Sequence, residues 1–254
     1  IVAPDGTVLA KAPMKGEAVV FADIDLSEAD NKLRPDGTDI MSTRRPELYA
    51  PLGLESASGG KKPGAENLLA GVGQVSGDAL SESKGQGKEA VASVLRMIAE
   101  GEEAGVKLIV LPELFHITNL ENAEKESQEM IRALQSALKD AYVATSIVED
   151  ETHMGVMFNK DGVVLKQLQL HKSGRHAWSK LGDEVNVFDA EWGRVALVIG
   201  NDAIYPETFR LAALKDVEVV AVPTMILEKW EVELTLSDDE RVALERAVME
   251  QIKV

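Results

Sequence analysis

The sequence predicts a protein of the α/β class, with a mixed sheet whose faces are covered by helices. Two observations support this prediction. Apolar residues recur at helical spacing over 88–104 and 123–139, and short apolar runs typical of buried strands alternate with those helices. The expected strands are 68–75, 107–111, 142–148, 155–158 before a turn at 159–162, the region of Phe188, 194–199 and 217–222, with further helices over 206–215 and 237–252.

The first 52 residues show a different pattern from the rest. A turn signal at Pro4–Gly6 lies between short apolar runs and predicts a β-hairpin, and residues 18–26 predict a buried strand. Residues 27–52 are largely polar and predict an extended segment on the surface. Residues 53–66 have the Ser, Gly, Lys and Pro composition of a flexible linker, so the domain boundary is expected there.

The composition excludes several classes of function. The chain has 254 residues with 27 Lys and Arg against 43 Asp and Glu, a formal net charge of -16. Lys and Arg nowhere gather densely enough to bind a phosphate backbone, so no nucleic-acid partner is expected. No apolar run approaches the roughly 20 residues of a membrane span, so we expect a soluble, cytoplasmic protein with no membrane partner. Ile1 is not a natural start, and the chain is expected to lie within a longer one.

The chain has no cysteine, which removes disulfides, thiolate metal sites and thiol nucleophiles together. Its histidines are His116, His153, His171 and His176. None of them has metal-ligand spacing with carboxylates on a common helix face, and no complete dinucleotide-binding glycine motif is present. No metal and no cofactor are therefore expected.

A glutamate at the end of a strand is the first candidate for chemistry. The run Val106–Phe115 reads VKLIVLPELF, so Glu113 closely follows a predicted buried strand, and Pro112 restricts the turn between them. A carboxylate there can face a cleft and act as a general base, or it can lie in solvent at the edge of the strand. The run resembles the segment of the nitrilase superfamily, the carbon–nitrogen hydrolases, that carries the catalytic glutamate.

The run Gly193–Ala212 resembles the nucleophile elbow of the same superfamily, in which a cysteine ends a strand. Gly200 stands at the cysteine position here. The residues that frame the loop in the family are retained as Asp202, Pro206, Glu207 and Arg210. A carboxylate–guanidinium pair among them can shape the loop even with no nucleophile present.

A third resemblance concerns the catalytic lysine, which lies two residues before a histidine in the family. Counting back from His171 places Gln169 at the lysine position, while Lys166 and Lys172 lie nearby. The family's lysine stabilises the oxyanion of a tetrahedral intermediate. A neutral amide can donate a hydrogen bond there but gives less electrostatic help.

The resemblance implies an α-β-β-α sandwich of the nitrilase type, and it runs from about Leu68 to the C-terminus. Residues 1–52 resemble the C-terminal end of a family domain, with a Pro-Asp-Gly hairpin, a strand ending in Asp-Ile-Asp-Leu and the run Arg-Arg-Pro-Glu-Leu-Tyr. We therefore expect 1–52 to be the C-terminal portion of one nitrilase-like domain, 53–66 a linker, and 67–254 a domain without its own closing hairpin. A tandem fragment is favoured over a permuted or swapped arrangement.

Three functions remain open. The favoured one is a catalytically inactive domain that serves in assembly or ligand binding, because the family's reaction needs its nucleophile most. The second is a part of an active carbon–nitrogen hydrolase whose working Glu-Lys-Cys site lies in another domain. The third is an enzyme in which Glu113 activates water. The resemblance implies a homo-oligomer formed through the nitrilase-type dimer surface or a higher assembly, and a small amide or nitrile as ligand.

Overall fold

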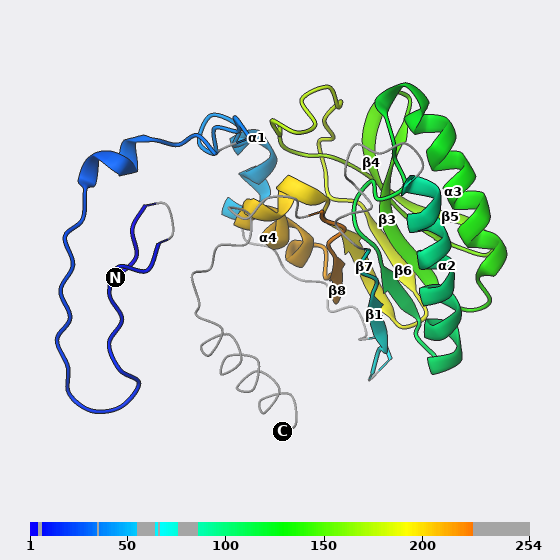
Figure 1. Cartoon of the computed structure of the whole chain (residues 1–254), viewed down its shortest axis with the longest axis horizontal. Coiled ribbons are helices and arrows are strands. Elements are labelled where there is room, and N and C mark those ends of the chain that lie inside the picture. Colours follow the sequence, from blue (N-terminus) through cyan, green and yellow to red (C-terminus); the bar gives the residue numbers. More distant parts are fainter. Residues whose placement is uncertain (5–6, 35, 55–63, 66, 76–85, 226–254) are drawn as a thin grey trace. The chain divides into compact units, whose positions relative to one another are not determined.

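The computed structural model describes residues 1–4, 7–34, 36–54, 64–65, 67–75 and 86–225. The chain divides into two compact units, one formed by Ile1–Pro35 with Ile226–Val254 and the other by Asp36–Met225 (Figure 1). Within the described residues, no helix combines the length and the apolar character needed to cross a membrane. The helix expected over 237–252 lies outside the described residues.

The first unit contains the bridge expected of the predicted hairpin but not the strand predicted over 18–26. Val2 and Val8 form an antiparallel bridge, as the hairpin predicts, although the turn residues 5–6 lie outside the described part. The strand predicted over 18–26 is wrong. Val19 and Phe21 are 78% and 84% exposed, and no described residue pairs with this run, whereas a strand needs a neighbour for its backbone hydrogen bonds. The 3-10 helix η1 (Leu26–Asp30) follows, with Asp25 as its N-cap.

The second unit contains a five-stranded sheet in the order β1 (Ala70–Val72), β2 (Leu108–Val110), β3 (Tyr142–Glu149), β4 (Thr152–Asn159) and β5 (Gly162–Leu168). The first three strands are parallel, and β4 and β5 continue the sheet as antiparallel hairpins. Parallel neighbours need a crossover, which α2 (Gln86–Ala104) and α3 (Ala123–Ala137) supply, the latter preceded by the 3-10 helix η4 (Leu120–Asn122).

A three-stranded sheet forms the second layer of strands. It contains β6 (Val187–Ala190), β7 (Gly193–Leu197) and β8 (Val219–Ala221), and β7 lies between its antiparallel neighbour β6 and its parallel neighbour β8. The connection from β7 to β8 contains the 3-10 helix η5 (Gly200–Ile204) and the helix α4 (Pro206–Leu214). The predicted positions of these strands and of α4 agree with the structure to within a few residues.

Three apolar clusters separate the layers. One packs α2 and α3 onto the five-stranded sheet through residues such as Val94, Leu134 and Val143. A second lies between the sheets, where Leu108 and Met157 meet Leu197. A third covers the other face of the three-stranded sheet. The order of layers is therefore helix, sheet, sheet, helix (Figure 1), and the predicted nitrilase-type α-β-β-α sandwich is confirmed.

Residues 36–54 pack onto the second sheet instead of extending across the surface. They form α1 (Pro46–Tyr49) and the 3-10 helix η2 (Ala50–Gly53), and Leu48 and Tyr49 are buried in the third apolar cluster together with Ala212 of α4. The extended surface segment predicted for this part of 27–52 is therefore wrong. Leu48 and Tyr49 supply the packing. Their contribution is not visible in the average composition of the segment, which is polar. The division into 1–52, 53–66 and 67–254 as pieces of two domains stays a prediction.

Candidate functional site

Gly200 lies next to the carboxylate of Glu113. It begins η5 after β7, and its φ of +47° lies in the left-handed region that favours glycine. A Cβ atom added at Gly200 would lie 2.3 Å from Oε2 of Glu113. The two positions that the family resemblance singles out are thus brought together, and the carboxylate takes the space that a larger residue at position 200 needs.

Glu113 is buried, with 4% of its surface exposed, so the alternative of a strand-end glutamate in solvent is excluded. It follows β2 and Pro112. Its two oxygens face different partners. Oε1 lies 3.6 Å from Nη1 of Arg175, and Oε2 lies 3.8 Å from Nε2 of His153. The guanidinium of Arg175 also donates a hydrogen bond to the backbone oxygen of Met225.

Gln169, at the family's lysine position, is held by two hydrogen bonds. Its Nε2 donates to the backbone oxygen of His171 over 2.5 Å, and its Oε1 lies 3.2 Å from Nδ1 of His153. On the other side of the ring, Nε2 of His153 lies 2.9 Å from Oγ of Ser146. Gln169 is therefore part of the same buried cluster as Glu113, through His153.

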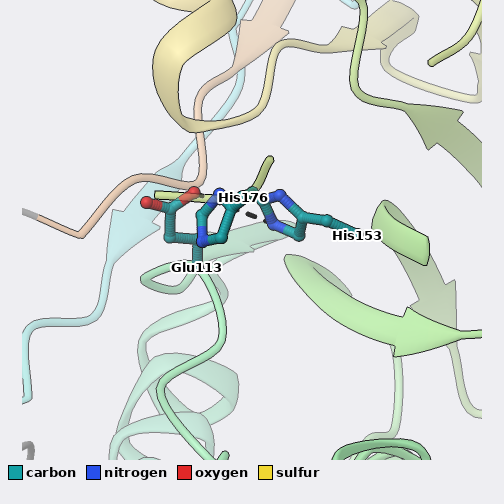
Figure 2. Close-up of side chains that lie close together, drawn as sticks. All are labelled: Glu113, His153 and His176. Atoms are coloured by element: carbon teal, nitrogen blue, oxygen red, sulfur yellow. Dashed lines mark ion pairs between the residues drawn. The ribbon is translucent and has the colours of Figure 1, made fainter. Parts of the chain in front are cut away.

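His176 completes this group, which we call the Glu113 cluster: Glu113, His153 and His176. The rings of His153 and His176 have centroids 4.2 Å apart, and one ligand atom from each of the three side chains lies within 4.8 Å of the others (Figure 2). Burial lowers the pKa of His153 to about 4 and that of His176 to about 2, so both rings are neutral at pH 7. Two neutral imidazoles and a carboxylate form a donor set that can hold a divalent transition metal.

Sequence reasoning missed the two histidines of this cluster. His153 lies in β4 and His176 in the loop between β5 and β6, so each comes from a different segment than Glu113. Spacing along one helix face could not reveal them. The available signal was the position of His153 in a largely apolar strand, where a side chain is expected to be buried. The expectation of no metal stays a prediction.

Asp202 is the centre of a second buried network. Its carboxylate accepts hydrogen bonds from the backbone N–H groups of Leu170 and His171, each over 2.8 Å, and lies 2.9 Å from Nδ1 of His171. On the opposite side of the ring, Nε2 of His171 lies 2.6 Å from the hydroxyl of Tyr49. Burial raises the pKa of Asp202, and the hydrogen bonds from His171 and Leu170 oppose that shift.

The other predicted elbow residues are only partly brought together. Pro206 begins α4, where its fixed φ suits the first helical turn. Glu207 does form a carboxylate–guanidinium pair, but with Arg44, whose Nη2 lies 2.6 Å from its Oε1. Arg210 is exposed and forms no ion pair with any residue that the structure describes. A pair within the elbow was the wrong expectation, because the fold lays residues 36–54 against the outer side of α4 and supplies a nearer guanidinium.

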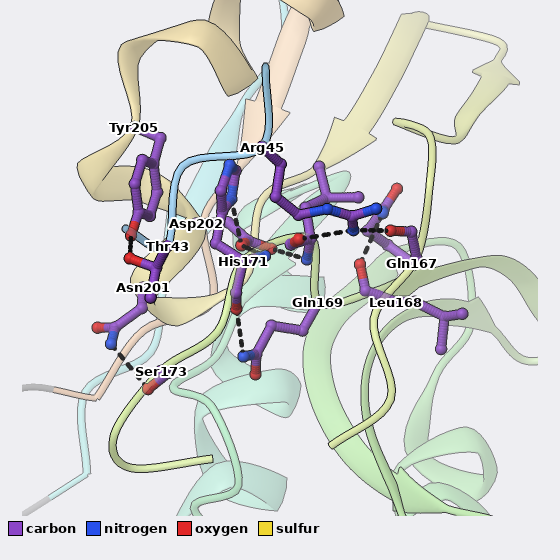
Figure 3. Close-up of polar contacts among 12 residues, drawn as sticks. Thr43, Arg45, Gln167, Leu168, Gln169, His171, Ser173, Asn201, Asp202 and Tyr205 are labelled. Carbon is purple, nitrogen blue, oxygen red and sulfur yellow. Dashed lines mark hydrogen bonds and ion pairs between the residues drawn. The ribbon is translucent and has the colours of Figure 1, made fainter. Parts of the chain in front are cut away.

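Residues 36–54 form the outer wall of the elbow. Arg45 donates through Nη1 to the backbone oxygens of Leu170 and Gly182, over 3.0 and 2.5 Å. The hydroxyl of Thr43 lies 2.5 Å from that of Tyr205 (Figure 3). These contacts come from a segment that the sequence placed in another domain, and they close the network around Asp202.

A cavity of about 480 Å³ lies elsewhere in the fold, between α2 and α3, with Val91, Met130 and His116 among its lining residues. None of the predicted site residues lines it. The candidate site at Glu113 and Gly200 is therefore not this cavity.

Comparisons with known proteins agree with this fold. Residues 70–248 match the family model of the carbon–nitrogen hydrolases. The probable hydrolase YhcX of Bacillus subtilis (strain 168) is 35% identical over 74 residues, which are 28% of this chain and 14% of that protein. An amidase from Nesterenkonia sp. superposes with a TM-score of 0.50 and 18% identity, over 56% of this chain and 61% of the amidase.

A cysteine-to-alanine mutant of the Nesterenkonia AN1 amidase, from the nitrilase superfamily, gives the same TM-score of 0.50, 18% identity, and coverage of 56% and 61%. The chain thus spans less than two thirds of the length of each of these proteins. At this identity the solved structures support the fold alone. The family model, in contrast, matches well over half of the chain. This chain therefore belongs to the carbon–nitrogen hydrolase family.

Proposed function

We propose that this chain is a catalytically inactive domain of the carbon–nitrogen hydrolase family, which serves in ligand binding or assembly. The observation that supports the proposal most directly is the close approach of Glu113 to Gly200, where an added Cβ would lie 2.3 Å from Oε2. In the family's reaction a thiolate attacks the carbon atom while a carboxylate acts as base. Here the base fills the place of the nucleophile.

The oxyanion partner is also absent in its usual form. The amide nitrogen of Gln169 donates to the backbone oxygen of His171, and the amide oxygen faces His153. Both polar atoms of the side chain are therefore engaged within the protein. Gln169 carries no charge to stabilise an oxyanion, and it does not present its donor to a substrate.

Ser146 is the hydroxyl residue whose surroundings most resemble those of a nucleophile. Its Oγ lies 2.9 Å from Nε2 of His153 and accepts a hydrogen bond from the backbone N–H of Leu114. A serine beside a histidine is the usual arrangement of an activated hydroxyl. Ser146 is, however, completely buried within β3. An acyl group cannot reach it without opening the sheet, so this pair supports the structure and not a reaction.

An amidase assay tests the inactive role. Ammonia release from short aliphatic amides and nitriles is measured for the wild-type chain, for Glu113→Ala, and for the double variant Gly200→Cys with Gln169→Lys. We expect none of the three to exceed the buffer blank, because a side chain at position 200 collides with the carboxylate of Glu113. Ammonia release by the wild type that Glu113→Ala abolishes would overturn the proposal and favour the water-activating enzyme.

The partial coverage of the amidases favours a second candidate, in which this chain is the inert part of a larger active hydrolase. Activity in protein isolated from its own source, together with none in the 254-residue chain, would support this candidate. The assembly role has its own measurement, which is the mass in solution by light scattering. A mass that is a multiple of 27.5 kDa supports a homo-oligomer, and a mass of 27.5 kDa leaves ligand binding as the proposed role.

A further inference from the structure

We propose that Glu113, His153 and His176 bind one divalent transition-metal ion, and that Zn²⁺ is the ion that this donor set fits best. Two histidines and a glutamate leave a fourth position for water, as a tetrahedral zinc site allows. This inference goes beyond the proposed function, because binding an ion requires neither hydrolysis nor its absence. Figure 2 shows the three side chains gathered at one point of the fold.

The distances are close to those of a metal site. The three ligand atoms lie within 4.8 Å of one another, and the distance from Oε2 of Glu113 to Nε2 of His153 is 3.8 Å. Ligands around a tetrahedral Zn²⁺ are separated by about 3.4 Å, given bonds of about 2.1 Å. Small side-chain rotations therefore suffice. His176 belongs to a loop, which can make that adjustment more easily than β4 can.

Gln169 sets which nitrogen of His153 is free to coordinate. The backbone oxygen of His171 can only accept, so the nitrogen of the Gln169 amide faces it and the amide oxygen faces His153. That oxygen accepts from Nδ1, which therefore carries the hydrogen of the neutral ring. The lone pair is left on Nε2, the atom that faces Glu113. A metal-binding histidine commonly donates its other N–H to an oxygen in this way.

The two altered family positions both support the same cluster. A lysine at position 169 could not accept from Nδ1 of His153, whereas Gln169 does. A side chain at position 200 would displace Oε2 of Glu113, whereas Gly200 leaves it facing His153. The replacements that remove the family's reaction are thus the ones that place a carboxylate oxygen and a ring nitrogen opposite each other.

The neighbouring groups define what the ion must displace. Nε2 of His153 now faces the hydroxyl of Ser146 at 2.9 Å, so coordination exchanges this hydrogen bond for a metal bond. Ser146 keeps the N–H of Leu114 as a partner. Arg175 lies 3.6 Å from the other oxygen of Glu113, and its positive charge reduces the affinity for a cation. Replacing Arg175 by Gln should therefore tighten metal binding. If the cluster binds no ion, the substitution should not change the zinc affinity of the chain.

Zinc titration of the metal-free chain tests the inference. Binding is measured by calorimetry in excess Mg²⁺, which occupies exposed carboxylates, and Co²⁺ absorption reports nitrogen ligands. We expect one Zn²⁺ per chain and a melting temperature that rises by roughly 5–10 °C at a free Zn²⁺ concentration of about 100 times Kd. Absence of saturable one-to-one binding would overturn the proposal.

Variants assign the ion to the cluster. Glu113→Gln and His176→Asn should each weaken Zn²⁺ binding at least tenfold, whereas Ser146→Ala should keep one ion per chain. The matched control is His116→Asn, because His116 is a buried histidine outside the cluster, paired with Ser127. Equal weakening by the control and the cluster variants would contradict the site. If His176→Asn fails to fold, Glu113→Gln, which keeps the side-chain shape, decides the result.

Discussion

Two buried histidine–carboxylate pairs lie near the elbow, and they differ in how tightly they are closed. Asp202 lies 2.9 Å from His171 and also accepts two backbone hydrogen bonds, while Tyr49 closes the other side of the ring. Glu113 lies 3.8 Å from His153, which is beyond hydrogen-bond distance. The first pair is closed by short contacts, and the second has the wider separation that the proposed ion would bridge.

The difference separates a pair that joins segments of the fold from a pair at the position where the family resemblance places chemistry. Asp202 joins η5 to the chain after β5 and, through His171 and Tyr49, to α1. It therefore ties three segments together. Glu113 lies at the position where the family resemblance places chemistry. We expect substitutions in the two pairs to have effects of very different size on stability, and four measurements test this expectation.

The largest effect is expected for Asp202→Ala. The substitution leaves two buried N–H groups and the ring of His171 without their acceptor, so the free energy of unfolding should fall by about 3–5 kcal/mol. Urea denaturation measures this change. Glu207→Ala is the control, because it removes a carboxylate of the same elbow from a partly exposed ion pair and should lower stability by less than about 1 kcal/mol. Equal losses would break the comparison.

His116 is a buried histidine that has no carboxylate partner among the described residues, and it gives the reference for both pairs. Burial lowers the pKa of His116 from 6.5 to about 3. As the pH falls, the unfolded chain therefore takes up a proton at this ring before the folded chain does. Its contribution to stability is complete above pH 6.5 and is lost as the pH falls toward 3. Between pH 7 and pH 4 this group alone should remove about 3 kcal/mol.

The test compares the pH dependence of unfolding for the wild type and His116→Gln, whose amide keeps a donor for Ser127. The variant should lose less stability than the wild type as the pH falls over this interval. Identical pH profiles would show that His116 is not held neutral by burial.

Tyr49→Phe tests how far the Asp202 pair extends. It removes the hydroxyl that lies 2.6 Å from Nε2 of His171 and keeps the apolar ring, so stability should fall by about 1–1.5 kcal/mol. Tyr142→Phe is matched to it, because its hydroxyl donates to the exposed carboxylate of Glu191 and should contribute less than about 0.5 kcal/mol. Thermal unfolding of both variants measures the difference, and a larger loss in Tyr142→Phe would limit the network to Asp202 and His171.

The smallest effect is expected for Glu113→Gln in the metal-free chain. The amide keeps the shape of the side chain and one acceptor oxygen, and it removes a buried charge, so the free energy of unfolding should change by less than about 1 kcal/mol. Urea denaturation with a chelator present measures it. A loss as large as that of Asp202→Ala would show that both pairs serve the fold equally.

The sequence predicted the elements with local signatures best. Helical spacing and apolar runs located α2, α3, β2 and β3 to within a few residues, since each pattern depends on neighbours along the chain. The strand expected over 18–26 failed for the opposite reason. Alternating apolar residues describe a surface suited to pairing, but pairing itself depends on a partner strand that no local pattern specifies.

The site was predicted in the same uneven way. The family resemblance singled out Glu113, Gln169 and Gly200. In the fold, Glu113 and Gln169 both face His153, and Gly200 lies next to Glu113. His153 and His176 come from distant segments, and Arg44 replaces Arg210 as the partner of Glu207. Such contacts depend on the packing of whole layers. Spacing within a motif carries no information about them.

Gly174 gives residues 36–54 their most sensitive point of contact. A Cβ atom there would lie 1.7 Å from the backbone oxygen of Asp36, and the N–H of Gly174 donates to the hydroxyl of Thr38. One methyl group at this position would push the segment away from the loop after β5. Close contact between residues 36–54 and the loop after β5 therefore requires a residue without a Cβ atom at this point, and the single nucleotide change that turns a glycine codon into an alanine codon is enough to disturb it.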